Sequence, residues 1–120
     1  MKTHAITTLT LNPSLDKSTH FSGLLAEQKM RCEIPRYDAG GGGINVSKAI
    51  LKLGGHTLCI FTSGGSSGEM LETLITNQKI ESAIIKTKNW TRENFIAFDD
   101  LSQAQYRFGF PGNELLDVEI

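Results

Sequence analysis

The sequence predicts an α/β fold, in which a parallel sheet packs against helices and carries a smaller, half-exposed sheet. Two observations predict the parallel part: short apolar segments alternate with segments of helical periodicity, and a run of glycines stands before the first predicted helix. A third observation is the alternation of polar and aromatic residues near the C-terminus, which predicts an antiparallel hairpin.

Three segments rich in apolar and β-branched side chains are predicted to be strands of the parallel sheet, the first two of them buried: residues 5–11, 57–62 and 82–87. A helix is predicted between the first two, from Ile44 to the glycine pair at 54–55. Its expected apolar face consists of Val46, Ala49, Ile50 and Leu53.

A second helix is predicted after residues 63–65, which form a turn. Ser66 and Glu69 have the spacing of a capping box, which marks a helix start. The apolar stripe of this helix is predicted to be Met70, Leu71, Leu74 and Ile75.

The remaining segments predict a second, smaller sheet. Residues 94–99 and 105–110 are expected to form a hairpin, with Tyr106, Phe108 and Phe110 on one face. Two polar segments that could join it into a four-stranded flap are residues 17–21 and 29–37, and Pro35 favours an edge position for the second.

The predicted organisation is one domain with two parts. An α/β core is expected at about residues 4–16 and 39–90, and lid strands at about residues 17–38 and 94–110. Residues 115–120 are expected to begin another element.

Composition argues against several functional classes. The chain is 39% hydrophobic and 21% charged, with a net charge of −1, which provides no attraction to nucleic acid or anionic lipid. No apolar run approaches the roughly 18 residues that cross a bilayer. Cys32 and Cys59 lack metal-site or disulfide spacing and suit a reducing cytoplasm, and His4, His20 and His56 show no metal-ligand spacing.

The glycine run at residues 40–43 is the strongest candidate for a ligand site. It lacks the Gly-Lys-Ser/Thr ending of a P-loop, and Val46 occupies the last glycine position of a dinucleotide motif. Four glycines carry an entropic cost on folding. A function that would offset this cost is the close approach of a ligand to the N–H groups at a helix N-terminus. A flexible turn is the alternative.

Three further residue types suit a phosphorylated sugar. The Asp16 carboxylate could accept from hydroxyl pairs, and Asn45 could both donate to and accept from a hydroxyl. Arg92 suits a phosphate. The alternatives are a solvated turn for Asp16, a helix cap for Asn45 and a surface charge for Arg92. Other cations of the predicted flap, which taken singly favour the surface, are Lys29, Arg31 and Arg107.

Together these segments resemble the pfkB family, the ribokinase-like carbohydrate kinases. The family signature of glycines followed by an asparagine is matched by residues 41–47 (GGGINVS), Gly54 and Gly64, with Ser47 where alanine is common. Residues 8–16 (TLTLNPSLD) resemble the phosphofructokinase and tagatose-6-phosphate kinase group. Segments similar to the minor 6-phosphofructokinase type are residues 29–32, 90–94 and 105–108.

The resemblance implies a site and a fold. It implies that Asp16 binds sugar hydroxyls, that Arg92 holds the phosphate of the substrate, and that Lys29 lies at the edge of the site. Residues implied to line the sugar site are Gly40, Gly41, Gly42 and Asn45. The implied fold is the N-terminal part of a doubly wound sheet with a small antiparallel β lid.

The implied activity is ATP-dependent phosphorylation of a ketohexose phosphate, fructose 6-phosphate above all, with MgATP used by the full-length parent. The family's general base, ATP pocket and magnesium motif are expected in a C-terminal half, so this chain would supply recognition and lid, and would be inactive alone. The resemblance also implies a cytoplasmic homodimer formed through the lid. Alternatives are a non-catalytic sugar-phosphate-binding or dimerisation module, and a kinase for fructose 1-phosphate, tagatose 6-phosphate or an unphosphorylated sugar.

Overall fold

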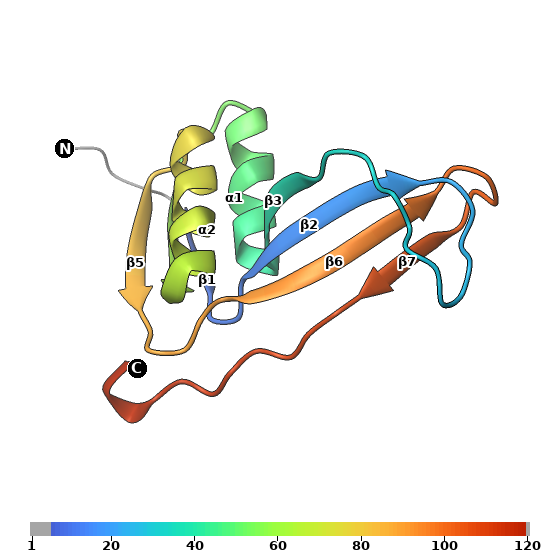
Figure 1. Ribbon diagram of the computed structural model, residues 1–120. Coiled ribbons are helices and arrows are strands. Elements are labelled where there is room, and N and C mark those ends of the chain that lie inside the picture. The colour runs from blue at the N-terminus through green and yellow to red at the C-terminus, as the bar shows by residue number, and fades with distance from the viewer. Residues whose placement is uncertain (1–5, 120) are drawn as a thin grey trace.

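The computed structural model describes residues 6–119 (Figure 1). The predicted extension of the first strand to residue 5, the start of the core at His4 and the last position, Ile120, lie outside the described residues. The elements in chain order are β1 (Ile6–Thr10), β2 (Ser14–Phe21), β3 (Arg36–Gly40), α1 (Gly42–Lys52), β4 (Thr57–Ser63), α2 (Gly65–Asn77), β5 (Ser82–Lys86), β6 (Arg92–Asp99), β7 (Gln105–Phe108) and a 3-10 turn at Asp117–Glu119.

The core sheet is parallel, with β4 between β1 and β5. Both helices pack on the same face of it (Figure 1). Cys59 and Phe61 of β4 are fully buried there against Ile44 of α1 and against Leu71 and Ile75 of α2. The predicted α/β class and the order strand, helix, strand are therefore confirmed.

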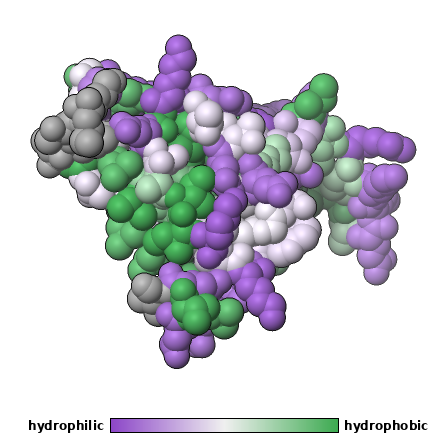
Figure 2. Space-filling view, turned by 90° about the vertical axis from the view of Figure 1, so that its left-hand side faces the viewer, coloured by the Kyte–Doolittle hydropathy of each residue, from purple (hydrophilic) through white to green (hydrophobic). Residues whose placement is uncertain are grey.

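The prediction of a buried strand is confirmed for β4, which has no exposed residue, but it was wrong for β1, which is buried on one face only. In β1, Thr8 and Thr10 face the helices and are buried, but Leu9 between them is 56% exposed. Figure 2 shows a broad apolar area on the side of the molecule where β5 lies. Within residues 6–119, no helix covers the face of the sheet opposite α1 and α2.

The predicted apolar face of α1 was wrong. Val46 and Leu53 are 48% and 87% exposed, and the helix instead buries Ile44 and Ser47. The buried face of α1 includes a serine, so its apolar periodicity is not visible in the sequence. The serine can be buried because its hydroxyl is hydrogen-bonded inside the protein. The predicted stop is confirmed, since Gly54 follows the helix with a φ of +88°.

The capping box predicted at Ser66 is absent. α2 begins at Gly65 without a side-chain cap. Its start is held by the segment before β6: Ser67 Oγ donates to the Thr91 carbonyl (2.7 Å), and the N–H of Gly64 donates to Thr91 Oγ1 (3.2 Å). A tertiary contact therefore replaces the local cap.

The second sheet, here called the lid, has the strand order β3-β2-β6-β7. The pairs β2–β3 and β6–β7 are antiparallel, but the central pair β2–β6 is parallel, so the lid is mixed rather than antiparallel. The reason is topological: β2 follows β1 and β6 follows β5, so both lid strands start at the carboxyl ends of the parallel core strands (Figure 1). Pro35 directly precedes the edge strand β3.

The period of two gives the lid two different faces. One face carries Asp16, Asn94 and Arg107. The other is apolar and has a hollow of 150 Å³. This hollow is lined by Phe21, Leu24, Met30, Cys32, Phe95, Ala97, Tyr106 and Phe108.

A buried hydroxyl cluster ties α1 to the core sheet. Ser47 is 1% exposed, and its Oγ lies 2.7 Å from Thr8 Oγ1 and 2.7 Å from Thr57 Oγ1. Alanine at this position would leave two buried threonine hydroxyls without this partner. The structure thus explains why this chain carries serine there.

Replacing Ser47 with alanine is expected to lower the free energy of unfolding by about 1–3 kcal/mol, because an unsatisfied buried hydroxyl costs that much. Denaturant unfolding followed by circular dichroism measures the loss. Adding Thr8→Val and Thr57→Val should recover most of it, because the polar groups are then removed together. Equal stability of Ser47→Ala and wild type would contradict this account.

The Asp99 carboxylate organises the far end of the lid. It is 3% exposed and accepts hydrogen bonds from the Gly23 N–H (2.9 Å), the Leu101 N–H (3.0 Å) and Ser102 Oγ (2.9 Å). The bond from Gly23 above all, together with those from Leu101 and Ser102, holds the pKa of Asp99 below its ordinary value, although burial opposes this.

Acid is therefore expected to destabilise the lid. A carboxyl whose pKa is lower in the folded state stabilises the fold above its unfolded pKa, and that stability is lost as pH falls through the folded pKa. The denaturant concentration at the unfolding midpoint should decrease as the pH is lowered below about 4. Asp99→Asn should make this decrease smaller. An equally steep acid loss in Asp99→Asn would assign the effect to other carboxyls.

Candidate active site

Polar side chains gather where β2 and β6 leave the core sheet. Asp16 of β2 and Asn94 of β6 are register partners, and Ser14 and Arg92 are the partners two residues earlier. Because side chains two residues apart on a strand share a face, all four project from one face of the lid. Parallel pairing of the two strands thus forms the site.

Asp16 has one oxygen held by the protein. Its Oδ1 accepts from Ser14 Oγ (2.7 Å) and from Asn94 Nδ2 (3.1 Å). Its Oδ2 lies so close to Gly40 that a Cβ added there would be 2.4 Å away. The described residues donate no hydrogen bond to Oδ2, so this oxygen can accept from a ligand hydroxyl.

The glycine run passes from β3 into α1. Gly41 has a φ of +133°, and a Cβ there would lie 2.7 Å from Thr10 Cγ2, so both backbone and space require glycine. At Gly42 the space for a Cβ is open. The N–H of Ile44 donates to Thr10 Oγ1 (3.1 Å), but the N-cap residue, Gly41, has no side chain to cap the helix, so the N–H groups before Ile44 can face a ligand.

Arg92 connects two segments of backbone. Its Nη1 donates to the carbonyl of Phe110 and its Nη2 to the carbonyl of Asn12, both at 3.2 Å. Each nitrogen carries two protons, so each retains one N–H. Nε is buried and has no hydrogen-bond partner among the described residues. The guanidinium can therefore donate to an anion while it holds both carbonyls.

An open hollow of 80 Å³ lies beside Asp16, between Asn94 and Arg107. Sequence reasoning gave no role to Ser14 or Asn94 and treated Arg107 as a surface cation. The spacing of Ser14 to Asp16 and of Arg92 to Asn94 was the available signal, since period two places each pair on one face.

Among the predicted site residues, Asp16 alone lines this hollow, and two of the others are exposed elsewhere. Asn45 is exposed in the first turn of α1. Lys29 is exposed in the loop between β2 and β3 and does not line the hollow, and its neighbour Met30 lines the apolar face of the lid. A single chain therefore does not bring Lys29 to Asp16.

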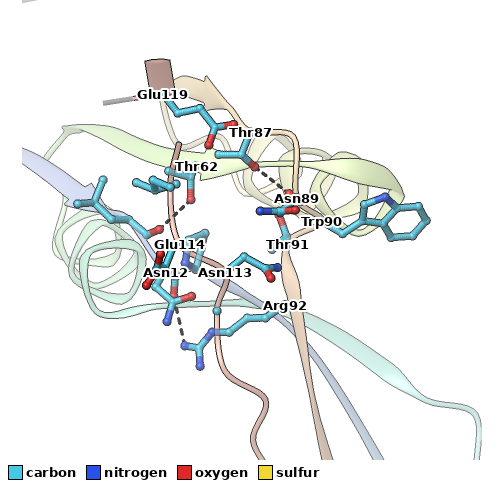
Figure 3. A pocket seen from close by; sticks show the side chains of 14 residues that line it. Asn12, Thr62, Thr87, Asn89, Trp90, Thr91, Arg92, Asn113, Glu114 and Glu119 are labelled. Carbon is cyan, nitrogen blue, oxygen red and sulfur yellow. Dashed lines mark hydrogen bonds between the residues drawn. The ribbon is translucent and has the colours of Figure 1, made fainter. Parts of the chain in front are cut away.

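A second polar pocket lies at the carboxyl ends of β4 and β5 (Figure 3). Thr62, Asn113 and Arg92 are among the residues around it, and its volume is 30 Å³. That space accommodates about one water molecule, and it is smaller than the 80 Å³ hollow beside Asp16. We therefore place the candidate substrate site at the larger hollow beside Asp16, whereas Arg92 lines the smaller pocket.

Within residues 6–119, no group of three or more His, Cys, Asp or Glu side chains is placed to hold a metal ion. Cys32 and Cys59 are both free thiols. In the part of the chain that the structure describes, neither helix is long and apolar enough to span a membrane.

Comparison with known proteins identifies the family of this chain. Residues 9–115 match the sequence profile of the pfkB family carbohydrate kinases. The chain is 44% identical over 114 residues to ATP-dependent 6-phosphofructokinase isozyme 2 of Escherichia coli, a match that covers 95% of the chain and 37% of the relative. It is 30% identical to a tagatose-6-phosphate kinase of Staphylococcus epidermidis, over 95% of the chain and 37% of that relative.

The fold agrees as well. The crystal structure of phosphofructokinase-2 from Escherichia coli in complex with fructose-6-phosphate superposes with a TM-score of 0.90 at 43% identity, covering 98% of this chain and 39% of that one. The chain thus spans well under half the length of these relatives. With a profile match over residues 9–115, the chain belongs to the pfkB family of carbohydrate kinases.

Proposed function

We propose that this chain supplies the substrate-binding part and the lid of an ATP-dependent kinase that converts fructose 6-phosphate to fructose 1,6-bisphosphate. The observation that carries the proposal is the placement of a carboxylate oxygen open to hydroxyl groups, Asp16 Oδ2, on the same lid face as Arg92 and Arg107. A phosphorylated sugar has hydroxyls at one end and a dianion at the other, which suits this pair of features.

Each group has a role in binding. Asp16 Oδ2 accepts from sugar hydroxyls, and the open backbone at Gly42 lets a ligand approach the N-terminus of α1. The remaining N–H groups of Arg92 hold the phosphate, and Arg107 adds positive charge beside the hollow at Asp16. Phosphoryl transfer depends mostly on positioning and charge neutralisation, so this recognition is a large part of the catalytic task.

The proposal assigns the nucleotide site and the general base to a further part of the protein. ATP supplies the γ-phosphoryl group in such kinases. No step of the phosphoryl transfer itself is assigned to the described residues. Their contribution is to bind the sugar, to orient it and to shield it from water.

Other substrates of the same class are the second candidate. Identity to the tagatose-6-phosphate kinase extends over the same residues, so tagatose 6-phosphate and fructose 1-phosphate are the alternative ligands. A non-catalytic sugar-phosphate-binding module is the third candidate, favoured by the recognition groups standing without a metal site among the described residues. An unphosphorylated sugar would leave Arg92 and Arg107 without an anion.

We further propose a cytoplasmic homodimer that forms through the apolar face of the lid. Phe108 is 53% exposed there, next to Tyr106 and the 150 Å³ hollow. A second copy would bury these side chains. Among the related structures, one is described as the tetrameric inhibited form of phosphofructokinase-2 from Escherichia coli. The net charge of −1 favours neither nucleic acid nor membrane as a partner.

Fructose 6-phosphate is expected to bind the chain saturably in isothermal titration calorimetry. Arg92→Ala should weaken binding at least tenfold, because charge-assisted hydrogen bonds to phosphate contribute about 1.5–3 kcal/mol. Asp16→Asn should also weaken it, because an amide presents fewer acceptors to the hydroxyls.

Lys52→Ala, at the exposed end of α1, is the charge-matched control and should leave affinity unchanged. ADP release with MgATP is measured on the same samples. Binding without turnover is the result expected for a recognition part alone. No heat with millimolar fructose 6-phosphate would reject the proposed substrate, and preference for tagatose 6-phosphate would select the second candidate.

Analytical ultracentrifugation is expected to show a dimer that Phe108→Glu converts to monomer, because a charge buried in the lid interface lacks a partner. Leu53→Glu is the matched control, since Leu53 is exposed at the end of α1, away from the lid. A dimer that persists in Phe108→Glu would place the interface elsewhere, with the uncovered face of the core sheet as the next surface to test.

A further inference from the structure

Asn94 uses both ends of its side-chain amide. Nδ2 donates to Asp16 Oδ1 (3.1 Å), and Oδ1 accepts from the backbone N–H of Phe110 (3.1 Å). Because the amide group is planar and rigid, the position of one partner constrains the position of the other. A side chain on β6 thus links the candidate hydroxyl-binding carboxylate to the segment that follows β7.

The backbone of Phe110 is also held through its carbonyl, which belongs to the next peptide unit. That oxygen accepts from Arg92 Nη1 (3.2 Å), and Arg92 stands two residues before Asn94 on the same face of β6. β7 ends at Phe108, so Phe110 lies beyond the ladder of the lid. Arg92 and Asn94 are the described side chains that bond to the backbone of Phe110.

These hydrogen bonds form a closed network. Arg92 Nη2 donates to the carbonyl of Asn12, in the turn that leads into Ser14 and Asp16. The path therefore runs from Asp16 through Asn94, Phe110 and Arg92 to Asn12, and back along the chain to Asp16. It joins the two groups that the proposed function assigns to opposite ends of the sugar phosphate.

We propose that Asn94 is a positioning residue that pre-organises both ends of the substrate site at once. By occupying Asp16 Oδ1 it directs Oδ2 towards the hydroxyls, and by holding Phe110 it keeps the carbonyl that fixes Arg92. The inference rests on the proposed function for its ligand. Binding is tighter when these groups are ordered in advance.

The role requires an amide of this length. Aspartate would still accept from the Phe110 N–H, but it would bring a second negative charge to Asp16 and donate nothing. Alanine would lose both bonds. Only a side chain that donates and accepts together can connect the two partners, so Asn94→Asp and Asn94→Ala separate one half of the linkage from the whole.

The linkage is tested first in the free chain by 15N-labelled NMR. Asp16→Asn is expected to shift the backbone amide of Phe110, and the same substitution made in the Asn94→Ala background is expected to leave that amide unchanged. A Phe110 shift that is equal in both backgrounds, or absent from both, overturns the inference. A purely structural role of Asn94 would not make the response depend on the background.

Calorimetry then tests the consequence for binding. Asn94→Ala should weaken fructose 6-phosphate about tenfold, the usual effect of losing hydrogen bonds to a charged group. Asn94→Asp should weaken it as well, although it retains slow hydrogen exchange at Phe110. The matched control is Asn77→Ala at the exposed end of α2, which should bind like wild type. Circular dichroism confirms that each variant is folded.

The outcomes separate the two proposals. If the wild-type chain binds no fructose 6-phosphate, the proposed function fails, and the Phe110 response still decides whether Asn94 links Asp16 to this peptide. If wild type binds and Asn94→Ala binds equally well, the proposed function stands and the positioning role is wrong.

Discussion

The two sheets of this chain meet where side chains are missing, and the site depends on that close approach. A Cβ at Gly40 would lie 2.4 Å from Asp16 Oδ2, and a Cβ at Gly43 would lie 2.4 Å from Thr10 Oγ1. Side chains there would force β3 and α1 away from β1 and β2. The glycine run has an entropic cost on folding, and this cost is offset by bringing a carboxylate to the start of a helix.

The lid extends from the core at the edge where open α/β sheets usually bind ligands, beyond the carboxyl ends of their strands. β2 and β6 both leave at that edge, so their first residues stand side by side and their polar face meets the glycine run. Because successive side chains of a strand point to opposite faces, the apolar residues of β2 and β6 gather on the other face. One pair of strands therefore separates the polar face that we propose for the substrate from the apolar face that we propose for association.

Local patterns predicted those parts of the structure that local forces determine. Apolar segments predicted β1, β4 and β5, and alternation predicted the hairpin of β6 and β7. A glycine predicted the end of α1 at Gly54. Each of these signals acts within a few residues. The prediction of the apolar face of α1 was wrong because the buried Ser47 hydroxyl is hydrogen-bonded to Thr8 and Thr57, which are distant in sequence. The capping box failed for a similar reason, because Thr91 holds the start of α2 instead.

By itself, the sequence determined the α/β class, the resemblance to a kinase family and the chemical groups available to a sugar phosphate, among them Asp16 and Arg92. Only the tertiary structure decided which groups meet. It joined Asn94 to Asp16 across 78 residues, added Arg107 to the hollow and left Lys29 outside it. The physical reason is that pairing between β2 and β6 arises from the order and direction of the core strands, which no short stretch of residues encodes.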